Sequence, residues 1–255
     1  MNDKRVHHQG RPRAREHGYS MIELSVALVV ALFLLNGMFM IMQNTRKTSS
    51  NQTALAQLQD EERVAMTMIT DVIQQAGYYP NPQTTDPTIM FTTDTTFGTA
   101  GQTIAGATNG NGDTITVRYQ GDSSNSVIDC LGNTIPNNTM EEMQFSVQAG
   151  TNNNGALELV CTINGNTVPL VPNVHSLSIW YGIDANASGS TNTYLQQASM
   201  GTYWTDVHSV KITVTFVNPL YGQPGQTNAA TNQYISFTRV IGVMAQTGVN
   251  SLTLF

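Results

Sequence analysis

The chain has 255 residues, enough for a membrane segment and one domain of ordinary size. Charged residues make up 11%, below the usual share of about a quarter, and Asn, Thr, Gln and Ser supply most of the polarity. This composition suits an exported protein better than a cytosolic enzyme. Residues 1–18 carry a net charge of +3 and residues 19–255 carry −9, which argues against non-specific binding to nucleic acid.

An apolar run follows the basic leader. Residues 24–42 contain no charge, and a helix of this length, at about 1.5 Å per residue, reaches close to the thickness of a bilayer's hydrocarbon core. A basic leader before such a run predicts that the leader stays in the cytoplasm and the remainder is exported. No A-x-A cleavage pattern follows the run, unlike in a secretory signal.

The stretch G-Y-S-M-I-E-L at residues 18–24 resembles the N-terminal pattern of type IV prepilins, with glutamate fifth after the cut. Tyr19 stands where such prepilins usually have phenylalanine. The resemblance implies that a prepilin peptidase cleaves between Gly18 and Tyr19 and that Tyr19 is N-methylated. It also implies an inner-membrane helix with a periplasmic domain, and later a place in a pilus at the cell surface.

Glu23 lies just inside the apolar run, where a carboxylate is costly unless it is paired. Cleavage would create a new α-amino group at Tyr19. We expect Glu23 of one subunit to pair with that amine on a neighbouring subunit in the assembly. The alternative is that Glu23, so close to the new terminus, is solvated at headgroup depth.

Four segments follow from the patterning: a leader at 1–18, a transmembrane and assembly helix at 19–43, an amphipathic helix at 44–77, and a periplasmic β-rich domain at 78–255. Residues 43–53 are polar and either remain helical or form a flexible joint. Gly77 and the prolines that follow it end the second helix. Apolar residues recur in that helix at three- and four-residue spacing: Leu55, Leu58, Ala65, Met68, Ile69, Val72 and Ala76.

The rest of the chain reads as β structure. Residues 78–112 look like a long loop with short strands at most, because Thr, Gly, Asn and Pro dominate them. Alternating apolar patterns then predict strands at 113–120, 143–149, 156–163, 175–183, 208–217 and 234–243. The predicted fold class is α+β, a long N-terminal helix packed on an antiparallel sheet of about six to eight strands.

Two cysteines, Cys130 and Cys161, lie in the exported part. A disulfide is expected there, and closing its loop of about 32 residues would contribute roughly 3–4 kcal/mol by the chain-entropy estimate. The alternative is two buried free thiols.

Several further stretches resemble the PilW family of minor pilins: residues 55–78, 129–133, 157–161, 168–186 and 204–216. The resemblance implies a pilin-like structural protein with no catalysis and no cofactor. Implied partners are other minor pilins, the major pilin, prepilin peptidase, inner-membrane lipid and a large tip adhesin, in a complex that primes pilus assembly and supports adhesion and twitching motility. Glu61 and Gln75 stand where the family usually has arginines, so contacts with neighbours would differ.

Other functions compete with this one. A J-type pseudopilin of type II secretion shares the leader and the helix. A directly binding tip adhesin subunit or a DNA-uptake receptor would need a basic or aromatic-lined groove. Residues 19–255 contain six Lys and Arg, so no nucleic acid partner is expected.

Candidate chemistry is sparse. The sequence has no G-x-S-x-G, no recognisable Cys–His pair and no P-loop. His175 and His208 suggest either a two-histidine metal site or, as we prefer, packed histidines. Residues 184–190 place Asp184, Asn186 and Ser188 at alternate positions, like the start of a calcium loop. Leu195 stands where the bidentate glutamate belongs, so an Asx-rich turn is the better interpretation.

Overall fold

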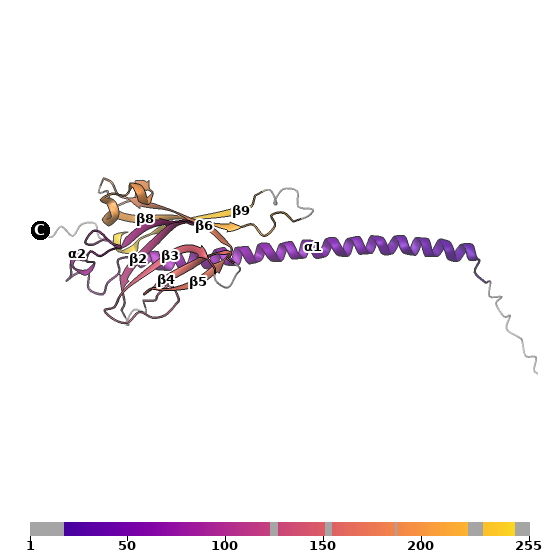
Figure 1. The fold of residues 1–255 in the computed structure, drawn as a ribbon, viewed down its shortest axis with the longest axis horizontal. Helices are drawn as coiled ribbons and strands as arrows, with labels where there is room; N and C mark the ends of the chain where they lie inside the picture. Colours follow the sequence, from indigo (N-terminus) through magenta and orange to yellow (C-terminus); the bar gives the residue numbers. More distant parts are fainter. Residues whose placement is uncertain (1–17, 123–126, 151–154, 187, 224–231, 248–255) are drawn as a thin grey trace, which may run out of the picture. The chain divides into compact units, whose positions relative to one another are not determined.

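A computed structural model describes residues 18–122, 127–150, 155–186, 188–223 and 232–247. The chain divides into two compact units, residues 1–50 and residues 51–255. Helix α1 (Met21–Gln74) supplies residues to both (Figure 1).

The polar stretch 43–53 is part of helix α1, so of the two predicted alternatives, a helix and a flexible joint, the structure has the helix. The hydroxyl of Thr45 donates to the carbonyl of Ile41 at 2.9 Å, and that of Thr48 donates to Asn44 at 3.0 Å. Both hydroxyls are hydrogen-bonded to carbonyls of the preceding turn, so these threonines do not interrupt the helix. After α1 ends, Gly77 takes a positive φ of 77°, the conformation typical of a glycine that closes a helix.

The second unit holds nine strands among the residues that the structure describes: β1 (Ile104–Asn109), β2 (Gly112–Gln120), β3 (Met140–Ala149), β4 (Leu157–Ile163), β5 (Asn166–Pro172), β6 (Val174–Ile183), β7 (Thr193–Leu195), β8 (Val207–Val217) and β9 (Tyr234–Gly242). The main order is β5-β4-β3-β2-β6-β8-β9, with β1 paired to β2 and β7 paired to β6. Short helical turns complete it: α2 (Pro87–Met90), η1 (Gln197–Ser199), η2 (Tyr203–Asp206) and α3 (Met244–Thr247).

The sheet is antiparallel apart from a short parallel contact between β2 and β6, where Gly112 pairs with Leu177. The C-terminal part of α1, from Leu58 onward, packs on one face of this sheet. Its buried residues, together with Ala76 just after the helix, form one core with the inward residues of the strands: Leu58, Ala65, Met66, Ile69, Val72 and Ile73. The predicted fold class is therefore confirmed.

The structure adds to the predicted elements and adjusts the apolar stripe. The expected loop at 78–112 contains α2 and β1. Met66 and Ile73 are buried in the core, whereas Leu55 is exposed and Met68 is half-buried. The sheet buries a wider face of the helix than a single row of residues at three- and four-residue spacing. Leu55 lies near the start of the second unit and is not buried by the sheet.

Candidate assembly site and the residues around it

The start of α1 places the residues of the predicted cleavage and assembly site. Gly18, Tyr19 and Ser20 precede the helix, and Tyr19 is exposed. The backbone N–H of Ile22 donates to the Ser20 hydroxyl at 3.4 Å, while the Ser20 carbonyl accepts the first helical bond, from Leu24. Ser20 is thus the N-cap of α1, a role that the sequence analysis missed although S-x-x-E is the spacing of a capping box.

Glu23 lies in the first turn of α1, three residues after the cap. A carboxylate there interacts favourably with the positive end of the helix dipole. The ion pairs within the described residues are Arg63–Asp60 and Arg118–Asp94, so Glu23 has no cationic partner inside the part of the chain that the structure describes. The residues 1–17 of the predicted leader lie outside the described residues.

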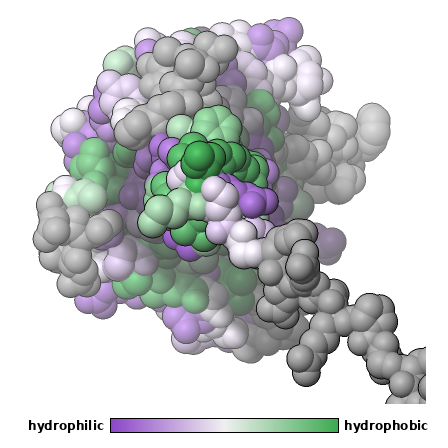
Figure 2. Space-filling model, turned by 90° about the vertical axis from the view of Figure 1, so that its right-hand side faces the viewer, coloured by the Kyte–Doolittle hydropathy of each residue, from purple (hydrophilic) through white to green (hydrophobic). Residues whose placement is uncertain are grey.

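The helix after Glu23 is long and apolar enough to cross a membrane. Side chains at described positions up to residue 50 are exposed. Figure 2 shows a hydrophobic patch near the centre of the face that it draws. The backbone hydrogen bonds of a helix are satisfied internally, so a helix can enter lipid. The exposed apolar side chains of this segment are hydrated unfavourably, and they therefore favour a lipid or protein environment.

The two cysteines form the predicted disulfide. Cys130 and Cys161 are joined, with a Cα–Cα distance of 6.5 Å, and both are buried. Cys161 is in β4, so the bridge fixes the segment around Cys130 to the sheet. The hydroxyl of Tyr119 supports the same segment by donating to the carbonyl of Ile128 at 2.6 Å.

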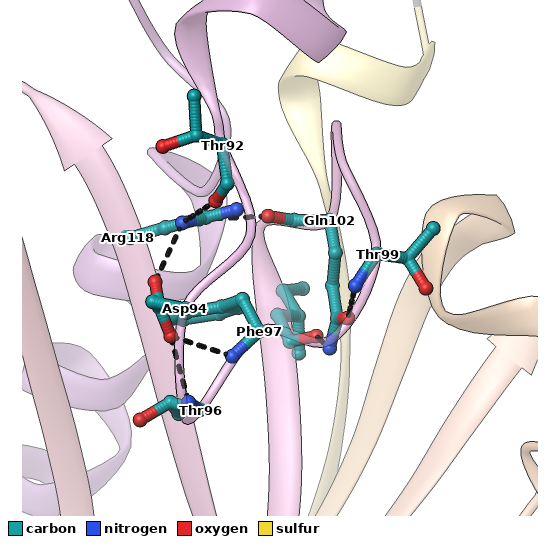
Figure 3. Close-up of polar contacts among 8 residues, drawn as sticks. Thr92, Asp94, Thr96, Phe97, Thr99, Gln102 and Arg118 are labelled. Atoms are coloured by element: carbon teal, nitrogen blue, oxygen red, sulfur yellow. Dashed lines mark hydrogen bonds and ion pairs between the residues drawn. The ribbon is translucent and has the colours of Figure 1, made fainter.

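A buried arginine in β2 was not recognised from the sequence (Figure 3). Nη1 of Arg118 lies 3.0 Å from a carboxylate oxygen of Asp94 and donates to the carbonyl of Thr92 at 2.8 Å. Nε donates to the carbonyl of Gln102 at 2.8 Å. One side chain thereby holds both ends of the loop between α2 and β1 against the sheet.

Aromatic rings enclose the same guanidinium. It lies 4.1 Å from the ring centre of Phe97 and 5.5 Å from that of Phe91. Burial lowers the pKa of Arg118, whereas the nearby carboxylates of Asp94 and Glu142 act in the opposite direction. Nη2 is buried without a hydrogen-bond partner among the described residues. Arg118 and its contacts with Thr92, Asp94 and Gln102, here called the Arg118 brace, hold this loop in place. The aromatic residues in the Thr-rich loop were the sequence feature that could have indicated a buried cluster.

Glu142 lies opposite Arg118 on β3. Burial raises the pKa of Glu142, and the nearby carboxylate of Asp94 raises it further, while Arg118 works against both. The ion pair of Arg118 is with Asp94, and Glu142 feels the charges of both groups.

Near this brace lies a cavity of about 640 Å³. Its described lining supplies aromatic, proline and small residues and one methionine, but no carboxylate, histidine or lysine: Gly77, Tyr78, Tyr79, Pro80, Pro82, Pro87, Phe91, Gly101, Thr103, Met244 and Ala245. These residues do not assemble a nucleophile with a base.

The structure separates the two histidines. His175 follows Val174 and His208 follows Val207, and the antiparallel register puts these positions at opposite ends of the β6–β8 pair. His175 stacks on Tyr234 with ring centres 3.9 Å apart. The two imidazoles therefore cannot share a metal ion.

Asp184 organises its own loop. Its carboxylate accepts bonds from the hydroxyl of Ser188, the backbone N–H of Gly189 and the amide of Asn192. Although burial acts in the opposite direction, the hydrogen bonds from Ser188 and Gly189 help to hold the pKa of Asp184 below its ordinary value. The arrangement is that of an Asx-rich turn. No cluster of three or more potential metal ligands occurs within the described residues, and residue 187 of this loop lies outside them.

A long N-terminal helix, apolar in its first half and covered by an antiparallel-dominated sheet in its second, is a pilin-like architecture. A family model described as Type IV Pilus-assembly protein W, PilW, matches residues 144–249, from β3 to just beyond α3. The predicted resemblance is thus confirmed over the C-terminal two fifths of the chain. The segments at 55–78 and 129–133 lie outside the match.

Among solved structures, the chain is similar to a type IV-like pilin from Thermus thermophilus. The two are 12% identical with a TM-score of 0.40, and the alignment covers 73% of this chain and 96% of the other. A likeness at this level carries no weight for function. No curated protein sequence matches the chain significantly.

Proposed function

We propose that this protein is a minor pilin that takes part in priming and assembly of a type IV pilus. In this proposal α1 anchors the newly made chain in the inner membrane with the second unit in the periplasm. Prepilin peptidase cleaves between Gly18 and Tyr19, and the new terminus is N-methylated. The match of residues 144–249 to a pilus-assembly family and the apolar first half of α1 both support the proposal.

The observation that carries the proposal is the position of Glu23. It is a carboxylate in the first turn of a helix that continues with an uncharged apolar run, and it has no cation to pair with among the described residues of its own chain. A group that must lose water on assembly requires a partner from another molecule. The α-amino group at Tyr19 of a neighbouring subunit supplies a positive charge at the matching depth.

The proposed partners follow from this role. Other minor pilins and the major pilin would contact α1 through its apolar face. From the family resemblance we also propose that the protein belongs to a complex at the pilus tip that supports a large adhesin. The cavity near Arg118 and the Asp184 loop offer no catalytic constellation among the described residues, so we propose an assembly role without catalysis or a cofactor.

The test is Glu23→Ala in a strain that carries this variant as its sole copy. Gly18 and the apolar run are untouched, so the variant should still insert and be cleaved. Removal of one member of a buried ion pair costs roughly 3–5 kcal/mol, which weakens incorporation more than a hundredfold. Because few copies of a minor subunit are needed, the expected result is fewer filaments per cell with ordinary filament shape.

Two matched variants sharpen the result. Glu23→Asp keeps the charge and should restore part of the piliation. Asp71→Ala removes an exposed carboxylate from the part of α1 that belongs to the second unit and should leave filament number unchanged. Ordinary piliation of the Glu23→Ala strain at ordinary protein level would contradict the pairing. Ordinary piliation with lost protein secretion would instead indicate a pseudopilin.

A further inference from the structure

The cations of residues 19–255 fall into two groups. Four of them have partners within the chain: Arg63 with Asp60, Arg118 with Asp94, Lys211 with the rings of Trp180 and Tyr194, and Arg239 with the hydroxyl of Thr70. The other two are Arg46 and Lys47 in α1, which are exposed. Within the part of the chain that the structure describes, neither has an ion pair or a side-chain hydrogen bond.

The surroundings of Arg46 and Lys47 on the helix do not neutralise them. Between Glu23 and Asp60 they are the sole charged residues in the sequence. The adjacent hydroxyls of Thr45 and Thr48 are already bonded to carbonyls of the helix. Their counter-charge therefore has to come from outside this segment.

The position of the pair matches the edge of a bilayer. Arg46 lies about one helical turn beyond residue 42, where the uncharged run ends. From Glu23 to Arg46 the helix rises about 35 Å, which exceeds the hydrocarbon core of about 30 Å and falls short of the 40–45 Å that includes both headgroup layers. When the run spans the membrane, both basic side chains reach the headgroup layer opposite the leader, helped by their long apolar stems.

We propose that Arg46 and Lys47 bind the phosphate groups of anionic phospholipids in that leaflet and so set the depth of α1 before assembly. The inference rests on the proposed function in one respect, that α1 crosses the bilayer. Anionic headgroups are the partner that fits, because they offer negative charge at the depth of the pair and surround every inserted copy. An exposed basic side chain near a bilayer attracts anionic headgroups that lie within about one Debye length of it.

The test uses the full chain in phosphatidylcholine vesicles that contain trace spin-labelled phosphatidylglycerol or spin-labelled phosphatidylcholine. Electron paramagnetic resonance measures which label associates with the protein. The unaltered chain should prefer the anionic label several-fold, with about 30-fold as the upper limit for two cations. In a chain with both Arg46→Gln and Lys47→Gln the preference should fall several-fold, and high salt should weaken the preference of the unaltered chain.

Arg63→Gln is the matched control, since it removes a cation of the same helix that is already paired with Asp60. The basic leader is identical in all three chains and cannot account for a difference between them. Resistance to carbonate extraction confirms that each variant is still inserted. The control should keep the full preference for phosphatidylglycerol.

Two outcomes overturn the proposal. Equal association of both labels with the unaltered chain would show that the pair does not select anionic lipid, and so would an unchanged preference in the double variant. If the double variant keeps its lipid preference but lowers piliation, the cations contact a carboxylate of another subunit. If the lipid preference is lost in the double variant while the Glu23→Ala strain has ordinary piliation, the pairing of Glu23 with a neighbouring subunit is contradicted and the lipid contact is still supported.

Discussion

Replacing Arg118 with leucine should destabilise the second unit more than any comparable change of a surface cation. The substitution removes the donors to the carbonyls of Thr92 and Gln102, each at 2.8 Å, and the ion pair with Asp94. The carbonyl of buried Gln102, left without its donor, costs about 1–3 kcal/mol. Thr92 is exposed, so water replaces much of the bond that its carbonyl loses. Asp94 is 36% exposed, so water recovers most of its loss and it adds less than about 1 kcal/mol. The expected loss in the free energy of unfolding is therefore about 2 kcal/mol or more.

The assay is denaturant unfolding of the full chain in mild detergent with the disulfide intact. Trp180 and Trp204 both lie in the second unit and report its unfolding by fluorescence. Arg63→Leu is the control, because Arg63 and Asp60 are 75% and 74% exposed and their pair should be worth less than about 1 kcal/mol. An Arg118→Leu effect no larger than that of Arg63→Leu would refute the brace as a source of stability.

Two further changes test other parts of the second unit. Cys161→Ser should lower the free energy of unfolding by about 3–4 kcal/mol, because it reopens a loop closed by cysteines 31 residues apart, and non-reducing peptide mapping of the unaltered chain should yield one Cys130–Cys161 peptide. Glu142 has a raised pKa in the folded chain, so its contribution to stability is present below its ordinary pKa and is lost as the pH rises through the raised value. Glu142→Gln should therefore stabilise the chain near pH 7, by less than about 1 kcal/mol for a partly exposed group, and flatten the pH dependence of denaturant midpoints; a lower midpoint at pH 7 would contradict the shift.

Periodicity predicted the elements whose environment is regular. The uncharged run 24–42, the ladder Leu58, Ala65, Ile69, Val72 and Ala76, and the alternating strands all indicate a helix that packs on a sheet, and the structure has this arrangement. The cysteine pair was equally readable because an exported chain with two cysteines has one way to join them.

The sequence pattern of a single segment could not predict contacts between segments that are distant in the chain. Arg118 follows Val117 in an alternating strand, where a polar residue normally faces water, yet the loop at 91–103 folds over that face and buries it. The register shift between Val174 and Ser176, beside His175, is likewise an irregularity that strict alternation does not predict. For the assembly site, the sequence placed Gly18, Tyr19 and Glu23 together but missed the capping role of Ser20.

Mass spectrometry of filaments sheared from the cell surface tests the central proposal most directly. The account predicts a small amount of this chain relative to the major subunit, beginning at Tyr19 with one added methyl group. Finding the chain in the membrane alone, with residues 1–18 still attached, while the cells carry ordinary filaments would contradict it.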